Sequence, residues 1–417
     1  MAISYPIIFK SENNTLAFEV SSKNEQLIKD FVLGLVQVFG DSETMTLEAI
    51  QKNEAATKNE LFHFLEQFRL KFPPVLNQVF SFFNNLEDDE HFLFLPGITL
   101  TAENSYKFHN HLISLRTKEP VEILNQRFEN IFGPALLNYD IAPYGSIRRF
   151  IGNRLERKCR FCGNDDSKTT FTQTAHAISE GLGNKKVFLY DECDICNEKI
   201  SRELEPDLIN YYSIFRTIFD VKGKGGSKKI KGKDFTIENN KGITITFEDI
   251  RHRPDPIGKS YDLEFELFDK VNSQDIYRCL CKFVLSVIDD HHLAQFKETI
   301  KWINKETSIK QLPEIAELIS NPHFTKEPLL FVYIRKTNDN KLPFAVGEFH
   351  LTCKIITFII PLSTADSQEF IDEKEYDHFT SQFVNYNRPE RWAFNDFSND
   401  TDRDFTFKLT TTVRDKI

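Results

Sequence analysis

Two Cys-x2-Cys motifs constrain this chain more than any other feature of its sequence. The first pair is Cys159 and Cys162, and the second pair is Cys193 and Cys196. Each motif forms a tight turn that points two thiolates at one position, and two such turns supply the four ligands that Zn²⁺ holds in a tetrahedron. Because all four ligands are thiolates, no coordination position is left for water, and we expect a structural Zn²⁺ site. Chance pairing of the motifs is the alternative.

The other cysteines and the composition indicate a cytoplasmic protein. Cys279, Cys281 and Cys353 lie in apolar segments and are expected to be buried as small apolar residues. The total of seven cysteines is odd, unlike the even number of a secreted disulfide scaffold. The N-terminus lacks a secretory signal, and no apolar run reaches the roughly 20 residues of a membrane helix. We therefore expect a cytoplasmic location and no membrane association.

The order of patterns along the chain predicts an α+β protein of several parts. Residues 1–147 are predicted to form a mainly helical region, and residues 148–220 form the cysteine segment. Residues 221–233 are rich in glycine and lysine, and residues 234–417 are predicted to form a mixed α/β region.

Several individual elements can be predicted within these parts. Residues 5–20 have the pattern of a β-hairpin, and Pro73 is expected to end a helix that begins near residue 47. An amphipathic helix is expected over Ile276–Val287, because its apolar residues recur on one face. A further helix is expected at 312–320, and the Ile- and Phe-rich residues 354–361 are expected to form a central strand.

Basic charge is concentrated around the cysteine segment. The net charge is −10, but residues 148–233 contain 18 Lys and Arg against 12 Asp and Glu, whereas the remainder contains 34 against 50. Phosphate contacts require such local positive charge. Six lysines after the cysteine segment alternate with glycine, and we expect a loop or extended arm that contacts nucleic acid; a solvated linker is the alternative. These are Lys222, Lys224, Lys228, Lys229, Lys231 and Lys233.

Two polar residues beside the cysteine motifs are candidates for catalysis. His176 lies in the run Thr-Ala-His-Ala-Ile, ahead of Gly-Leu-Gly, and Asn197 directly follows the last cysteine. A histidine side chain has an unperturbed pKa of about 6.5, so its neutral form accepts a proton at physiological pH. The alternatives are that His176 is an ordinary hydrogen-bonded histidine and that Asn197 caps the helix expected after Cys196.

Two further histidine-containing runs are interpreted as structural. His109 and His111 occupy alternate positions on a predicted helix and therefore point to different sides of it. The run Asp289-Asp-His-His292 follows the amphipathic helix and is interpreted as a solvated helix terminus.

Taken in order, the motifs resemble the zinc-containing, treble-clef form of the HNH endonuclease family. The resemblance covers about residues 158–208 and rests on Cys-x2-Cys, the Ala-His step ahead of Gly-Leu-Gly, and Cys-x2-Cys-Asn at the start of a helix. It implies two strands and a helix around one catalytic metal. It also implies that His176 is the general base and that Asn197 ligates a catalytic Mg²⁺ or Mn²⁺. The implied reaction is hydrolysis of a phosphodiester bond, leaving a 5′ phosphate.

The expected architecture is therefore a central zinc-stabilised ββα-metal (treble-clef) nuclease domain between a mainly helical N-terminal region and a mixed α/β C-terminal region. The resemblance favours DNA over RNA as the substrate, and it is compatible with defence against invading DNA. The flanking regions would set substrate access, a protein partner or a homo-oligomeric state.

The sequence departs from the family pattern at particular positions. Many members carry Asp or Glu just before the catalytic histidine as a metal ligand, whereas this chain has Ala175. The asparagine that orients the histidine in the family falls near Phe188 by spacing, and Asn184 is the nearest asparagine. Glu205 resembles an acidic position that some members have after Cys-Asn. Two alternatives therefore stay open: an inactive zinc module that binds nucleic acid or protein, and a nuclease subunit that acts only with a partner such as an ATPase.

Overall fold

The structure of the chain is a computed structural model that describes most of its residues. The described residues are 3–12, 14–40, 48–98, 102–223, 229–240, 242–247, 260–320, 324–382 and 391–412. The chain divides into two compact units, Met1–Leu136 and Leu137–Ile417, and each is described by itself. Both units contain helices and strands, as expected for an α+β protein.

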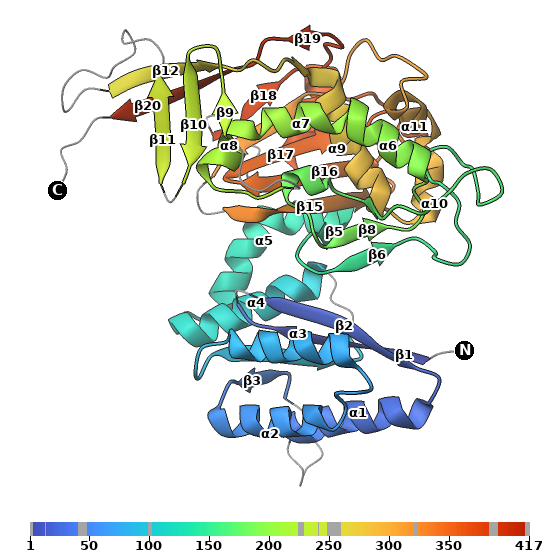
Figure 1. The fold of residues 1–417 in the computed structure, drawn as a ribbon, viewed down its shortest axis with the longest axis vertical. Coiled ribbons are helices and arrows are strands. Elements are labelled where there is room, and N and C mark those ends of the chain that lie inside the picture. Colours follow the sequence, from blue (N-terminus) through green and yellow to red (C-terminus); the bar gives the residue numbers. More distant parts are fainter. Residues whose placement is uncertain are drawn as a thin grey trace. The chain divides into compact units, whose positions relative to one another are not determined.

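The first unit is built on a four-stranded antiparallel sheet in the order β2-β1-β4-β3 (Figure 1). The predicted N-terminal hairpin is confirmed, because β1 and β2 pair along their whole length. The strands are β1 (Ile3–Lys10), β2 (Thr15–Ser22), β3 (Ile50–Lys52) and β4 (His91–Pro96). The helices are α1 (Glu25–Phe39), α2 (Ala55–Glu66), α3 (Pro73–Asn84), α4 (Ala102–Thr117) and α5 (Val121–Asn138).

This unit contains more sheet than the sequence predicts. Residues 1–147 are expected to be mainly helical, but β4 is a buried strand in the middle of a sheet. Its apolar run is too short for periodicity to separate a strand from a buried helix. The predicted helix from near residue 47 to Pro73 is wrong at both ends, because β3 occupies Ile50–Lys52 and α2 spans only Ala55–Glu66. Pro73 begins α3 instead, since the first turn of a helix loses nothing through a missing N–H.

A core rich in phenylalanine stabilises the first unit. Phe9 on β1 and Phe31 on α1 are fully buried. The ring of Phe9 lies 5.1 Å from that of Phe94 and 5.2 Å from that of Phe83. Burial of one such side chain contributes about 1.5–3 kcal/mol, so the cluster supplies this unit with a hydrophobic core of its own.

The second unit is built on a six-stranded sheet in the order β18-β14-β17-β16-β15-β5. Strand β17 (Lys354–Ile359) lies inside this order with every residue buried, which confirms the predicted central strand. The predicted helix at 312–320 is wrong, because β14 (Ile315–Ile319) pairs with β17 and β18 there. Its short apolar run fits a strand as well as a helix. The other strands are β5 (Tyr139–Tyr144), β15 (Thr325–Arg335), β16 (Ala345–Thr352) and β18 (Ala393–Asn395).

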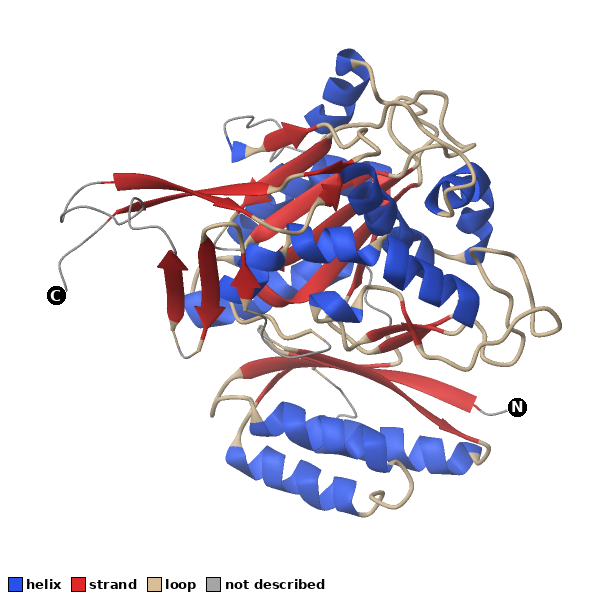
Figure 2. Cartoon of the chain, turned by 45° about the horizontal axis from the view of Figure 1, so that its top comes forward, coloured by secondary structure: helices blue, strands red, loops and turns tan. Residues whose placement is uncertain are grey.

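Helix α9 (Ser273–Val287) packs against this sheet and is buried along its whole length (Figures 1 and 2). Its predicted apolar face is confirmed by two contacts with the sheet. The Tyr277 hydroxyl donates to the carbonyl of Ile359 at 2.7 Å, and the ring of Phe283 lies 5.7 Å from that of Phe349. The polar face of α9 is buried as well, which amphipathic periodicity does not predict.

The cysteine segment covers part of that polar face and belongs to the same unit. The sequence predicts separate parts for residues 148–220 and 234–417, whereas residues of both ranges share one hydrophobic core. The segment contains β6 (Arg149–Ile151), β7 (Ala175–His176), β8 (Val187–Leu189) and the 3-10 helix η1 (Glu180–Leu182). It continues with α6 (Asp194–Glu203), α7 (Glu205–Tyr211) and α8 (Ser213–Ile218).

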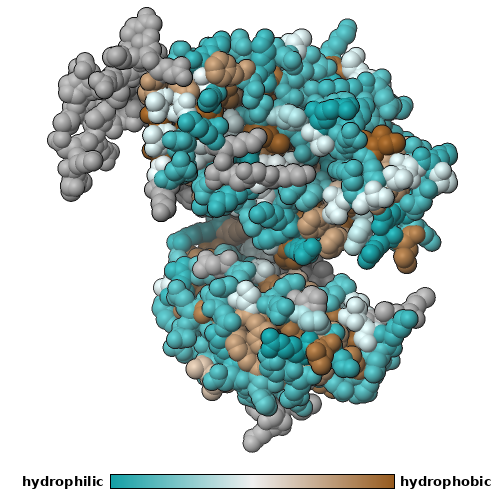
Figure 3. Space-filling model, in the orientation of Figure 1, coloured by the Kyte–Doolittle hydropathy of each residue, from teal (hydrophilic) through white to brown (hydrophobic). Residues whose placement is uncertain are grey.

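Smaller elements complete the second unit. Its other helices are α10 (Asp290–Leu293), η3 (Ala294–Phe296), α11 (Lys297–Ile303) and α12 (Glu373–Ser381). One small sheet has three strands, β9 (Ile230–Lys231), β10 (Phe235–Asn239) and β11 (Ile243–Phe247). Two more have two strands each: β12 (Ser260–Glu266) pairs with β20 (Thr406–Thr412), and β13 (Val271–Asn272) pairs with β19 (Asp402–Arg403). Within the described residues, no helix has both the length and the apolarity needed to cross a membrane. Hydrophilic side chains cover most of the molecular face drawn in Figure 3.

Candidate metal centre and histidine site

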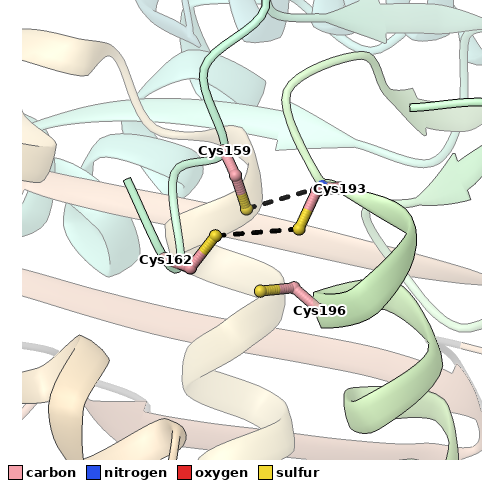
Figure 4. A group of neighbouring side chains, drawn as sticks. All are labelled: Cys159, Cys162, Cys193 and Cys196. Atoms are coloured by element: carbon pink, nitrogen blue, oxygen red, sulfur yellow. Dashed lines mark hydrogen bonds between the residues drawn. The ribbon is translucent and has the colours of Figure 1, made fainter. Parts of the chain in front are cut away.

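The four predicted cysteines meet at one point (Figure 4). Their Sγ atoms all lie within 4.8 Å of one another, and the Sγ atoms of Cys162 and Cys193 are 3.7 Å apart. Sulfurs at the corners of a tetrahedron with Zn–S bonds of 2.3 Å are separated by about 3.8 Å, so the cluster fits a zinc ion. Cys162 is exposed and the other three are buried. The cysteines outside the cluster, Cys279, Cys281 and Cys353, are buried as predicted.

The electrostatics of the cluster favour a bound cation. A hydrogen bond with Cys196 lowers the pKa of the Cys159 thiol to about 5, although burial acts in the opposite direction. Burial raises the pKa of Cys162 to about 11, and the hydrogen bond with Cys159 raises the pKa of Cys196. One thiolate therefore forms at the expense of its neighbours. A divalent cation removes this conflict, because it neutralises the thiolates that bind it.

Arg160, inside the first cysteine motif, anchors the cluster to helix α9. Its guanidinium group is buried and donates to the carbonyls of Leu285 and Ile288 at 3.0 and 2.9 Å, at the end of the helix. It also forms ion pairs with Asp191 at 2.8 Å and Asp290 at 2.9 Å. A buried arginine with this set of acceptors fixes the first motif against the C-terminal region. The only sign of this role in the sequence is a charged residue between the two cysteines of the first motif.

Asp194 organises the loop that enters the histidine strand. Its carboxylate accepts hydrogen bonds from the hydroxyls of Thr170 and Thr172 at 2.6 and 2.7 Å, and from the backbone N–H of Gln173 at 2.9 Å. Burial opposes ionisation, but these hydrogen bonds lower the pKa of Asp194 to about 2. Residues 170–173 are thereby held over the first turn of α6.

His176 lies on the outward face of a small sheet beside the cysteine cluster. Strands β7 and β8 are antiparallel, with His176 opposite Phe188, and helix α6 follows them in sequence. Ala175 is buried, whereas the His176 side chain retains 21% of its exposure. Gly183 has a φ of 100° at the end of η1, a left-handed conformation that glycine adopts readily, and the chain turns there toward β8.

The imidazole of His176 lies beside the side chains of Glu180, Phe188 and Asn184. Its Nε2 lies 3.9 Å from a carboxylate oxygen of Glu180, and its ring lies 5.0 Å from that of Phe188. Its Nδ1 is 3.5 Å from the amide nitrogen of Asn184. The Asn184 oxygen accepts from the backbone of Lys186 and Val187, both at 3.0 Å. Asn184 therefore closes the β7–β8 loop, and its oxygen is occupied by backbone donors rather than by the histidine.

A lysine from α9 holds the backbone of the histidine strand. The ammonium group of Lys282 donates to the carbonyl oxygen of His176 at 2.8 Å and pairs with Glu192 at 3.0 Å. Both side chains are buried, and burial raises the pKa of Glu192 to about 7. This link joins residues more than 100 positions apart in the chain. Sequence reasoning missed Lys282, because a lysine in an amphipathic helix is ordinarily solvated.

Asn197 lies in the first turn of α6, and Glu205 is the first residue of α7. Cys193 is the N-cap of α6, so the alternative that Asn197 caps this helix is wrong. The Asn197 amide nitrogen lies 3.2 Å from the Gln173 side-chain oxygen. Glu205 accepts a hydrogen bond from the Ser179 hydroxyl at 2.6 Å, which fixes the start of η1.

The lysine-rich segment is partly folded, which corrects the prediction of a free loop. Ile230 is buried, and Ile230–Lys231 forms β9, which pairs with β10. Lys229 pairs with Glu238 at 3.5 Å, and Lys233 pairs with Glu266. One apolar side chain among the lysines is enough to attach this end to the small core beneath it. Lys222 is exposed, whereas Lys224 and Lys228 lie outside the described residues.

A second group of potential metal ligands lies at the end of α9. Among the described residues, ligand atoms of Asp289, His291 and His292 lie within 4.8 Å of one another. Asp289 and His291 are exposed, in agreement with a solvated terminus.

No family model, curated protein or solved structure matches the chain.

Proposed function

We propose that this chain is a metal-dependent HNH-type endonuclease that hydrolyses phosphodiester bonds, with DNA as its favoured substrate. The observation that supports the proposal is the position of His176. It faces outward on the first of two antiparallel strands, and the helix after them begins at one clustered cysteine, its N-cap Cys193, and contains a second, Cys196. This order of strand, strand and helix is the one that the family resemblance implies. The treble-clef assignment belongs to the same proposal.

In this mechanism the neutral imidazole of His176 takes a proton from the attacking water. Lys282 and Phe188 position the histidine, one through its backbone carbonyl and the other through its ring. Phosphodiester hydrolysis also needs positive charge at the phosphate. Mg²⁺ uses one or two protein carboxylates together with phosphate oxygens and water, so Glu180 is a suitable ligand. Asn197 is the second ligand in this proposal, and the bound metal would stabilise charge on the leaving oxygen.

A plasmid assay tests this function. The zinc-loaded full chain is incubated with supercoiled plasmid and Mg²⁺ or Mn²⁺, beside His176→Ala. His111→Ala is the matched control, because His111 is exposed on α4. We expect cleavage by the parent and the control, and a loss of about 10² to 10⁴ in rate for His176→Ala. Glu180→Gln should weaken the response to the divalent metal. Equal rates for His176→Ala and the parent would contradict the mechanism.

One observation favours a second candidate, a zinc module that binds nucleic acid without cutting it. Ala175 is 1% exposed and packs in the core, so the position that carries a metal-binding carboxylate in many HNH endonucleases holds a buried methyl group here. In that case the plasmid assay gives binding without cleavage under every metal condition. A partner-dependent nuclease differs again, because added partner would restore cleavage that still depends on His176.

A further inference from the structure

The solvent face of the β6-β8-β7 sheet carries aromatic side chains where polar ones are usual. Alternation along β8 buries Val187 and Leu189 and leaves Phe188 partly exposed. Phe150 on β6 lies directly opposite Phe188 and is 45% exposed. His176 lies opposite Phe188 on the other side. The residues Phe150, Phe188 and His176 therefore form one row across this mixed sheet, and exposed aromatic side chains in a row are an informative exception on a solvent-facing surface.

Phe150 lies nearly parallel to two neighbouring rings, whereas the His176 ring is tilted by 55° to that of Phe188. Phe150 stacks on Phe188 at 5.0 Å with an interplanar angle of 20°, and on Tyr190 at 5.2 Å with an angle of 16°. We call Phe150, Phe188 and Tyr190 the aromatic face. A planar ligand that stacks on the outside of this group of rings meets a flat π-surface, and the imidazole of His176 lies beside Phe188.

Arginines surround the aromatic face. The guanidinium carbon of Arg148 lies 5.4 Å from the Phe150 ring centre and 5.3 Å from that of Phe188. Arg157 lies 5.9 Å from the ring centre of Tyr190. Arg157 donates hydrogen bonds to the backbone carbonyls of Arg154 and Phe171, which hold its guanidinium group in place without neutralising its charge. In the described part of the chain, neither Arg148 nor Arg157 forms an ion pair with a carboxylate. Their charge is therefore available to a ligand that carries negative charge beside a flat ring.

We propose that the aromatic face binds an unpaired nucleobase of single-stranded nucleic acid, with Arg148 and Arg157 contacting the adjoining phosphates. Aromatic side chains combined with positive charge are the features that bind single strands without strict sequence preference. A duplex interior does not fit, because its bases are already stacked on one another. The consequence for substrate choice rests on the proposed function. A nuclease with this face acts on substrates that present a single-stranded segment next to His176.

Binding without cleavage tests this proposal separately from nuclease activity. Fluorescence anisotropy is measured with labelled dT12, rU12 and a 12-base-pair duplex, on the zinc-loaded full chain without added Mg²⁺ or Mn²⁺. We expect both single strands to bind more tightly than the duplex, and the comparison of dT12 with rU12 identifies the sugar that is preferred. Phe150→Leu should weaken single-strand binding by about 10-fold or more, whereas Phe150→Trp should preserve it. Arg148→Gln should reduce the salt slope by about 0.7.

Phe268→Leu is the matched control, because Phe268 is 62% exposed on a different segment. It should bind like the parent. Duplex binding tighter than single-strand binding, or a Phe150→Leu variant that binds as the parent does, would overturn the proposal. Single-strand binding through this face in a chain that cuts no nucleic acid would leave the proposal standing and remove the nuclease. Cleavage that is lost in His176→Ala, together with unchanged single-strand binding in Phe150→Leu, would support the nuclease and overturn the binding proposal.

Discussion

The first unit and the cysteine segment reach order by different means. In the first unit, long strands and helices enclose fully buried phenylalanines such as Phe9 and Phe31. In the cysteine segment, the strands are two or three residues long, and four cysteines meet at one point. Two-residue strands bury too little apolar surface to be stable alone. The segment instead depends on the cluster of four cysteines, which could hold a metal ion, and on helix α9, which supplies Lys282 beneath the histidine strand.

This difference indicates where function can be placed. A side chain on a short strand is positioned only if something else fixes the strand, and here a cysteine cluster and buried polar contacts do so. Sites need such support, because small displacements reduce activity strongly. The contrast is testable with local probes. Both tryptophans, Trp302 and Trp392, lie in the second unit, so tryptophan fluorescence reports on that unit, and hydrogen exchange reports on both.

The largest expected effect is the loss of one zinc ligand. Cys159→Ser should remove the metal and unfold the cysteine segment, because structural zinc contributes on the order of 10 kcal/mol in small zinc domains. Elemental analysis should give one zinc per chain for the parent and for Cys353→Ser, a cysteine outside the cluster. Hydrogen exchange in the first unit should not change. Zinc well below one equivalent in the parent would contradict the claim that a bound metal stabilises the cysteine segment.

The converse change targets the core of the first unit. Phe9→Ala should destabilise that unit by about 3–5 kcal/mol, because it removes a fully buried ring from an aromatic cluster. Hydrogen exchange measured during urea unfolding should be faster in residues 3–98 alone. The zinc content and the tryptophan transition should stay at parental values. A parallel loss in both units would mean that the two are energetically one body.

A smaller effect is expected where the cysteine segment docks on α9. Lys282→Met should destabilise the second unit at the lower end of about 3–5 kcal/mol. The cost is limited because Glu192, whose pKa burial raises to about 7, can take up a proton when its partner is absent. The double variant Lys282→Met/Glu192→Gln should recover part of the stability lost in Lys282→Met, as measured by thermal unfolding monitored through tryptophan fluorescence. Single and double variants as stable as the parent would show that the pair is not needed.

The smallest effect is expected from the lysine-rich segment. Lys229 and Lys233 already pair with Glu238 and Glu266, so the double change to serine should alter the log–log salt dependence of duplex binding by less than about 0.9. Anisotropy titrations between low and physiological salt measure this slope. A decrease in this slope of about 1.8, which corresponds to two phosphate contacts, would support the predicted nucleic-acid-binding arm.

The sequence predicted the parts of the molecule whose chemistry or periodicity is local. The cysteine spacing identified the cluster, and the patterns at Ile276–Val287 and 354–361 identified a helix and a central strand. It failed at residues 312–320, where a short apolar run does not separate strand from helix. It also missed Arg160 and Lys282, because the backbone carbonyls of Leu285 and His176 to which they donate lie more than 100 residues away, and only the fold brings them together.

The most direct test of the account is a single-turnover cleavage of a labelled oligonucleotide that contains both duplex and single-stranded segments. The zinc-loaded chain is used in excess with Mg²⁺ or Mn²⁺, and the product ends are analysed beside the rate. The account predicts products with 5′ phosphates and a rate that falls by about 10² to 10⁴ in His176→Ala, with zinc content unchanged. Cleavage by His176→Ala at the parental rate, or no cleavage by the parent under either metal, would contradict it.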